Sequence, residues 1–177
     1  MFGTKIYMGE PDVKMFRENP ELALIQECGN CTEKLFDVDV SIKEGDILTF
    51  GNTEIEFHLI PGHTQGCIAC FFDVTNGAEK KRVGYYGGFG FNTLQEEYLR
   101  EIGDETLEAR KQYHHSLASV REQKVDIFMG NHTANVDLLN KRKYMTEHPG
   151  ENPFIDSEAW KNYLDLKEKE LSELEQA

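Results

Sequence analysis

The sequence lacks the features that mark membrane, exported or nucleic-acid-binding proteins. Its longest uninterrupted apolar run is six residues, 67–72, whereas a membrane-spanning helix needs about 20. No apolar stretch of signal-peptide type follows Met1, so we expect a cytoplasmic protein. Basic residues are few, 19 against 32 acidic ones, and the net charge of −13 repels phosphate backbones and anionic lipid. We therefore expect neither nucleic acid nor membrane as a partner.

Cysteine is also scarce, and its four copies fall into two pairs. Cys28 and Cys31 flank a Gly-Asn turn, and Cys67 and Cys70 lie in a run typical of a buried strand. A four-cysteine zinc module is one interpretation of this spacing. Residues three apart in a strand point to opposite faces, however, and free cysteine is commonly buried. We therefore favour buried thiols for the second pair.

The 177 residues, 39% of them hydrophobic, suffice for one core and predict a single domain over 1–177. Strand-like patterns occupy 36–42, 67–74, 82–86 and 125–129, and a hairpin joins 47–50 to 54–60 across Gly-Asn-Thr. We expect 36–72 to be mostly an antiparallel meander. Helical patterns occupy 11–19, 93–100, 104–123 with Asp104 as N-cap, and 136–147. This order predicts an α/β sandwich with helices layered on sheet.

The residue pattern of the C-terminal segment 153–177 predicts an amphipathic helix that begins near Ser157. Its apolar residues recur at helical spacing with charges between them, and they are Trp160, Leu164, Leu171 and Leu174. Such a stripe indicates a packing face rather than a cofactor site.

Two loops place a histidine directly after a predicted strand. His63 follows Pro-Gly at the end of 54–60, and His132 follows Gly-Asn at the end of 125–129. Loops at strand ends are where α/β proteins hold ligands and catalytic groups. Gly88 and Asn92, in and after the glycine-rich stretch 87–90, are candidates for substrate binding. A turn before the helix at Thr93 explains the same residues, and we favour the turn.

The stretch 44–69 contains Gly-Asp-Ile-Leu-Thr-Phe-Gly and then Pro-Gly-His63-Thr-Gln-Gly. It resembles the third metal-ligand motif of metallo-β-lactamase-fold hydrolases, and 126–132 is similar to their last metal motif. The resemblance covers about 35–135. It implies a partial αββα sandwich and a reaction in which one or two zinc ions hold a hydroxide that hydrolyses a β-lactam, ester, thioester or lactone.

The sequence departs from this family in two places. The motif H-x-H-x-D-H is absent, as is any H-x-H, and 83–93 lacks the bridging aspartate of many members. The third-subclass β-lactamases also lack that aspartate, and the chain looks closest to them. In that scheme His63 binds the first zinc and His132 the second, which leaves one protein ligand for each ion. Catalytic zinc needs three, so we assign no catalytic residue and expect the chain alone to be an incomplete, inactive hydrolase.

Two other expectations follow from the missing part of the family fold. The first is a non-catalytic role, as a hydrolase remnant that serves as an interaction or structural module. The second is a homodimer or larger assembly, because an apolar sheet face and an unpaired strand edge rarely stay exposed. The alternating residues of 36–42 and the run 68–72 are the parts we expect to be uncovered.

Overall fold

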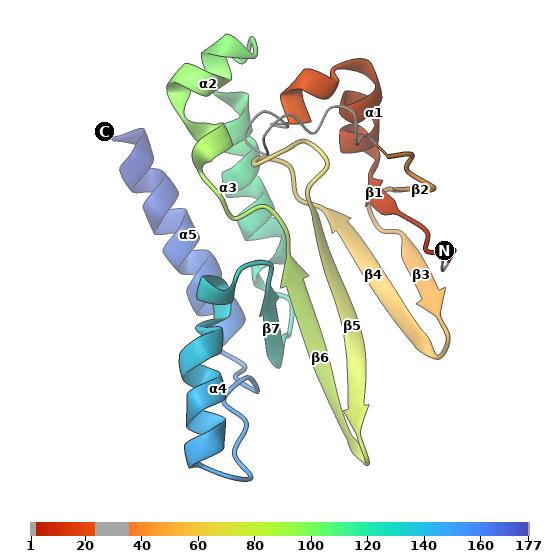
Figure 1. The fold of residues 1–177 in the computed structure, drawn as a ribbon. Coiled ribbons are helices and arrows are strands. Elements are labelled where there is room, and N and C mark those ends of the chain that lie inside the picture. Colours follow the sequence, from red (N-terminus) through yellow and green to blue (C-terminus); the bar gives the residue numbers. More distant parts are fainter. Residues whose placement is uncertain (1–2, 24–35, 177) are drawn as a thin grey trace.

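A five-stranded sheet forms the centre of the molecule (Figure 1). The computed structural model describes residues 3–23 and 36–176. The strands stand in chain order, antiparallel from the first to the fourth, with the last parallel to its neighbour. They are β3 (Ile47–Phe50), β4 (Thr53–Leu59), β5 (Ile68–Asn76), β6 (Glu79–Tyr86) and β7 (Ile127–Gly130). The hairpin expected across Gly51 is present, with Phe50 paired to Thr53.

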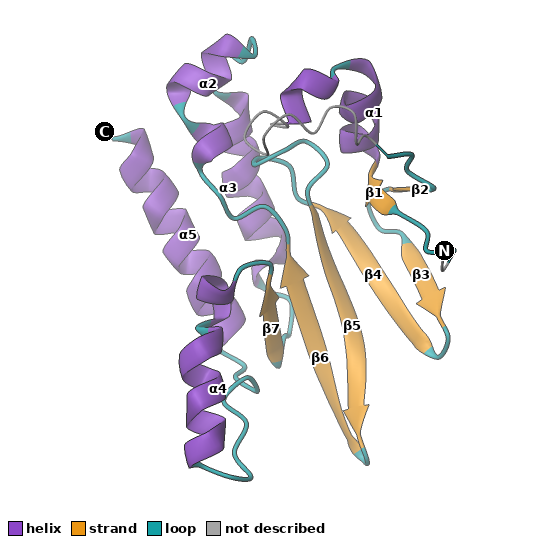
Figure 2. Cartoon of the chain, in the orientation of Figure 1, coloured by secondary structure: helices purple, strands orange, loops and turns teal. Residues whose placement is uncertain are grey.

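Two long helices cover one face of this sheet, α3 (Glu108–Arg121) and α5 (Ala159–Glu175) (Figure 2). Trp160 of α5 lies at the centre of the core, with its ring 5.4 Å from Phe71 and 5.7 Å from Phe128. Its indole N–H donates to the carbonyl of Val120 at 3.0 Å, which joins the two helices. The predicted C-terminal helix is thus present, beginning at Ala159, and its stripe residues Trp160, Leu164 and Leu171 are buried.

The amino-terminal part forms a second, two-stranded sheet. β1 (Tyr7–Gly9) pairs in parallel with β2 (Val40–Ile42), and α1 (Glu10–Glu18) and the 3₁₀ turn η1 (Pro20–Ala23) follow β1. The sequence-based meander is therefore wrong at its start. The strand expected over 36–42 is regular only from Val40, because its partner is β1 rather than β3.

The remaining helices are short. They are η4 (Asn92–Leu94), α2 (Glu96–Glu101), η5 (Thr133–Val136) and α4 (Leu138–Glu147). Asp104 lies four residues before α3, and its carboxylate accepts the backbone N–H of Glu108 and Ala109 at 2.8 and 2.9 Å. The prediction of Asp104 as N-cap is wrong in position, because the helix begins later than predicted and its N-cap is Leu107, but the Asp104 side chain still accepts the first backbone N–H groups of α3.

The architecture is mixed α/β, as predicted. Within 3–23 and 36–176, the structure contains no helix with the length and apolarity needed to cross a membrane. Cys28 and Cys31 lie outside these residues, whereas Cys67 and Cys70 are free thiols.

Candidate functional site

Three strands end at one edge of the sheet. β5 runs antiparallel to both β4 and β6, and β7 is parallel to β6, so β4, β6 and β7 point the same way. Their carboxyl ends lead into the loop of His63, the glycine stretch 87–90 and the turn of His132. The two histidines thus follow strands that end at a common edge of the sheet.

His63 is half-buried against the glycine loop. Its Nδ1 lies 2.9 Å from the carbonyl oxygen of Gly90 and 2.9 Å from the hydroxyl of Thr93. Because a carbonyl only accepts, Nδ1 carries the hydrogen, and the lone pair of the neutral ring lies on Nε2. Burial lowers the pKa of His63, although the Gly90 hydrogen bond and the charge of Asp12 oppose the shift. The ring is therefore held neutral, with Nε2 as its basic nitrogen.

Asp12 fixes the His63 loop from one side. Its carboxylate accepts the Thr64 hydroxyl at 2.5 Å and the Gly66 N–H at 2.7 Å. The backbones are in close contact here, since a Cβ at Gly9 would overlap the carbonyl of Gly66. Burial raises the pKa of Asp12, and its two hydrogen bonds partly offset this shift.

Helix α3 fixes the same loop from the other side. Ser116 donates its hydroxyl hydrogen to the carbonyl of Pro61 at 2.7 Å. Gly62 has a φ of +146°, and a Cβ there would lie 2.6 Å from the Cβ of Tyr113. The glycine of Pro-Gly-His is therefore required both by its backbone conformation and by the helix packed against it.

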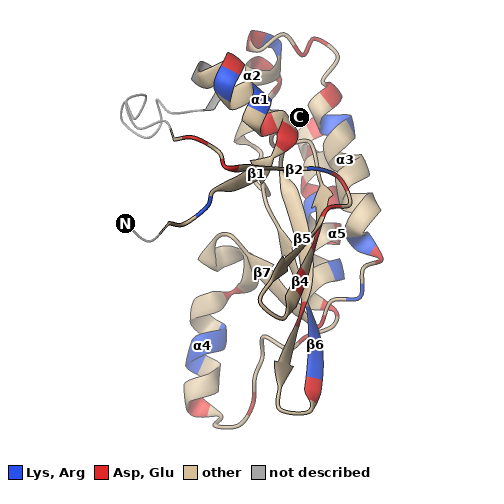
Figure 3. Ribbon diagram, turned by 90° about the vertical axis from the view of Figure 1, so that its right-hand side faces the viewer, with Lys and Arg blue, Asp and Glu red and all other residues tan. Residues whose placement is uncertain are grey.

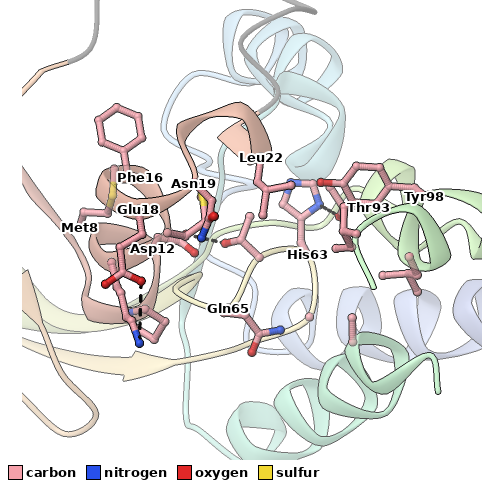
Figure 4. A pocket seen from close by; sticks show the side chains of 18 residues that line it. Met8, Asp12, Phe16, Glu18, Asn19, Leu22, His63, Gln65, Thr93 and Tyr98 are labelled. Atoms are coloured by element: carbon pink, nitrogen blue, oxygen red, sulfur yellow. Dashed lines mark hydrogen bonds and ion pairs between the residues drawn. The ribbon is translucent and has the colours of Figure 1, made fainter. Parts of the chain in front are cut away.

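A cavity of about 740 Å³ opens beside His63, between α1 and the helices α2 and α3 (Figure 4). His63 and Asp12 are its titratable groups nearest the loop, and much of the remaining wall is apolar. That apolar wall includes Met8, Met15, Phe16, Leu22, Leu99 and Ile102. The residues that line it include neither His132 nor the sequence-predicted substrate candidates Gly88 and Asn92.

Gly88 instead lies against the back of the histidine. It has a φ of +75°, and a Cβ there would overlap Sγ of Cys67 and lie 3.0 Å from Cβ of His63. Asn92 is exposed and begins η4. The backbone at Gly88 brings the glycine-rich loop into contact with His63, and the first turn after this loop is η4, which begins at Asn92.

His132 occupies a separate, exposed turn. Its backbone N–H donates to Oδ1 of Asn135 at 2.9 Å, and Nδ2 of Asn135 donates to the Tyr163 hydroxyl at 2.6 Å. This chain of contacts ties the turn to α5. The Asn135 side chain also explains why residue 130 is a glycine, because a Cβ at Gly130 would overlap it.

The described residues do not fit a zinc centre by themselves. Among them, no three histidine, cysteine, aspartate or glutamate side chains converge as metal ligands. The carboxylate of Asp12, whose charge acts on His63, accepts hydrogen bonds from Thr64 and Gly66. Burial raises the pKa of the Cys67 thiol, which lies 3.0 Å from the Thr64 hydroxyl and stays protonated at neutral pH. His63 thus supplies one imidazole ligand, whereas catalytic zinc needs three protein ligands.

Asp12, Ser116 and Thr93 were not among the residues predicted for the site. Each contacts the His63 loop from a segment at least 30 positions away in sequence. Asp12 follows a proline at a helix start, which is typical of any helix N-terminus. No local pattern distinguishes it, so only the folded chain identifies its role.

No protein-family model matches this sequence, and no curated protein matches it either. Solved structures do match. BJP-1, a subclass B3 metallo-β-lactamase of Bradyrhizobium japonicum, aligns with 98% of this chain at 23% identity and a TM-score of 0.73. FEZ-1 of Legionella gormanii aligns with 98% at 24% identity and 0.77, and GOB-18 of Elizabethkingia meningoseptica with 98% at 22% and 0.77. The chain spans 65% of the length of the first two and 63% of the third.

Proposed function

Because this chain has part of the metallo-β-lactamase fold, we propose that it is part of a zinc-dependent hydrolase of that superfamily. In this proposal His63 is a ligand of the first zinc ion and His132 of the second. The substrate is a β-lactam, ester, thioester or lactone. The chain alone is incomplete and does not hydrolyse its substrate.

The hydrogen bond from Nδ1 of His63 to Gly90 carries this proposal. Metal-binding histidines usually donate one ring N–H to a carbonyl or carboxylate, which orients the other nitrogen toward the metal. His63 has this arrangement at the end of β4, beside the cavity. Its lowered pKa keeps Nε2 deprotonated at neutral pH, as ligation requires.

Inactivity of the chain alone follows from the number of ligands. Zinc in hydrolases lowers the pKa of bound water and so provides hydroxide at neutral pH. One histidine for each ion does not hold the metal in a three-ligand site. The remaining ligands must come from groups outside the described residues. Without those groups, neighbouring residues orient His63, but no zinc site is complete.

Zinc titration followed by NMR of the histidine side chains tests the proposal. We expect weak binding that shifts the His63 Nε2 signal and is lost in His63→Ala. His115→Ala is the control, because His115 is exposed on α3. Unchanged His63 signals at millimolar zinc would contradict a ligand role for this residue.

A second candidate function is a non-catalytic interaction or structural module. The observation that favours it is the apolar row of Leu48, Ile55, Phe72 and Ile127, which the strand register places on the sheet face opposite α3 and α5 and which is not fully buried. Absence of any zinc effect at His63, together with self-association through that face, would favour this second function over the first.

A further inference from the structure

The cavity beside His63 has two apolar walls that come from different parts of the chain (Figure 4). Met15 of α1 and Leu22 of η1 belong to one wall. Leu99 of α2 and Ile102, directly after that helix, belong to the other. Because His63 lines the same cavity, a molecule held between these walls lies beside the histidine.

The cavity is large enough for a substrate with a long apolar group. Its volume of about 740 Å³ lies within the range of small-molecule sites, about 300–1,000 Å³. A methylene group occupies about as much space as one molecule of liquid water, about 30 Å³. An aliphatic chain of eight carbons therefore needs about 240 Å³, which leaves room for the reacting group that the chain carries.

The described residues of the cavity wall offer no free cation. Lys14 is their only lysine or arginine, and its ammonium group lies 4.0 Å from the carboxylate of Glu18, which lines the same cavity. Asp12 adds a second carboxylate. The basic runs 80–82 and 141–143 lie at the other end of the molecule, on β6 and α4 (Figure 3). A ligand carboxylate in this cavity would therefore lie among carboxylates without a cation to pair with, which is costly.

We propose that the cavity binds the aliphatic chain of an uncharged ester, thioester or lactone, and so selects such substrates over β-lactams that carry a carboxylate. This inference rests on the proposed function, because it names the substrate class of the same site. Penicillins and cephalosporins have an ionised carboxylate beside the lactam ring, whereas aliphatic esters and lactones have none. Apolar burial supplies the affinity, and each buried methylene group should tighten binding about fourfold.

Binding of γ-lactones of increasing chain length tests the proposal. Isothermal titration calorimetry of the full chain, in EDTA and without zinc, compares γ-hexalactone, γ-octalactone and γ-decalactone with benzylpenicillin. We expect the dissociation constant to fall about tenfold at each step of the lactone series, and benzylpenicillin to bind more weakly than γ-decalactone. Dissociation constants that do not change along the series would overturn the proposal. Binding of benzylpenicillin as tight as that of γ-decalactone would overturn it as well.

The variant Ile102→Lys shows where the lactones bind and why charge matters. Ile102 is 40% exposed, so the variant should keep the wild-type circular dichroism and melting temperature. The new cation should weaken binding of γ-decalactone at least tenfold and tighten binding of benzylpenicillin. Met15→Gln, on the opposite wall, keeps the length of the side chain and should weaken γ-decalactone at least threefold.

Leu166→Lys is the matched control for Ile102→Lys. Leu166 is 44% exposed, but it lies on α5 and is not among the described residues that line the cavity. This control should bind γ-decalactone as the wild type does. Equal weakening by Leu166→Lys and Ile102→Lys would overturn the proposal, because the lactones would then bind outside the cavity.

The zinc titration of His63 separates this inference from the proposed function. Zinc shifts at His63 together with lactone binding that does not depend on chain length would overturn the inference and leave the hydrolase proposal standing. Binding that depends on chain length, with His63 signals unchanged at millimolar zinc, would contradict the hydrolase proposal and with it the assignment of the cavity as a substrate site.

Discussion

The carboxylate of Asp12 accepts a hydrogen bond from the hydroxyl of Thr64, 52 positions later in the chain, at 2.5 Å. This hydrogen bond joins the start of α1 to the residue directly after His63. The position of the histidine therefore depends on packing between the small amino-terminal sheet and the central one, and not on the loop sequence alone.

Asp12→Ala should destabilise the protein by about 2–4 kcal/mol, because it leaves the Thr64 hydroxyl and the Gly66 N–H without their acceptor. Urea unfolding measures the change. Glu18→Ala is the control on the same helix. Within the described part of the chain, its carboxylate makes an exposed ion pair with Lys14 at 4.0 Å and no other interaction, so its loss should cost less than about 0.5 kcal/mol. Equal effects of the two substitutions would contradict the role given to Asp12.

Gly88→Ala should destabilise the protein more than Gly77→Ala. Both glycines have positive φ, +75° and +65°, so both substitutions carry a backbone cost of about 1 kcal/mol. Only at Gly88 does the new methyl group also overlap Cys67 and crowd His63, which should add about 1–3 kcal/mol. Thermal unfolding of the two variants gives the difference. Equal losses of stability in the two variants would contradict the close packing of Gly88 against Cys67 and His63.

His114 should make stability depend on pH. Burial opposes its protonation, but hydrogen bonds to Glu168 and Glu175 of α5 prevail and raise its pKa. A raised pKa means that the folded state holds the proton more tightly than the unfolded state. The stabilisation is therefore complete below the ordinary value of 6.5 and is lost as the pH rises through the folded-state pKa.

The variant His114→Gln isolates this contribution. Wild type should lose more unfolding free energy than the variant between acidic and mildly alkaline pH, and their difference should shrink as the pH rises. His115→Gln, at the exposed neighbouring position, should follow the wild type. A difference between wild type and His114→Gln that does not vary with pH would contradict the link between α3 and α5.

The sequence predicted the elements that local signals define. The hairpin at Gly51, the start of α1 at Pro11 and the stripe of α5 depend on turn residues and periodicity within a few positions. The parallel pairing of β1 with β2 joins Tyr7 to Val40, and no local pattern specifies such a partner. The motif around His63 predicted the fold, but the contacts of Asp12, Thr93 and Ser116 arise from tertiary packing, which periodicity does not encode.

The apolar faces of the strands show the same limit. The alternation of 36–42 and the apolar run 68–72 predicted uncovered strand faces, but a sequence pattern alone does not say which layer covers which side. Ile42 is buried, whereas Met129 is exposed. The difference depends on where α1, α4 and α5 lie, and that is fixed by the whole chain.

Our central proposal is that this chain has part of the metallo-β-lactamase fold and orients His63 as a zinc ligand, and that its described residues offer too few ligands for it to act alone. Nitrocefin hydrolysis by the purified 177-residue protein in excess zinc tests it most directly. We predict no turnover above that of the His63→Ala variant. Robust zinc-dependent turnover that His63→Ala abolishes would contradict the claim, because it would require a complete zinc centre within this chain.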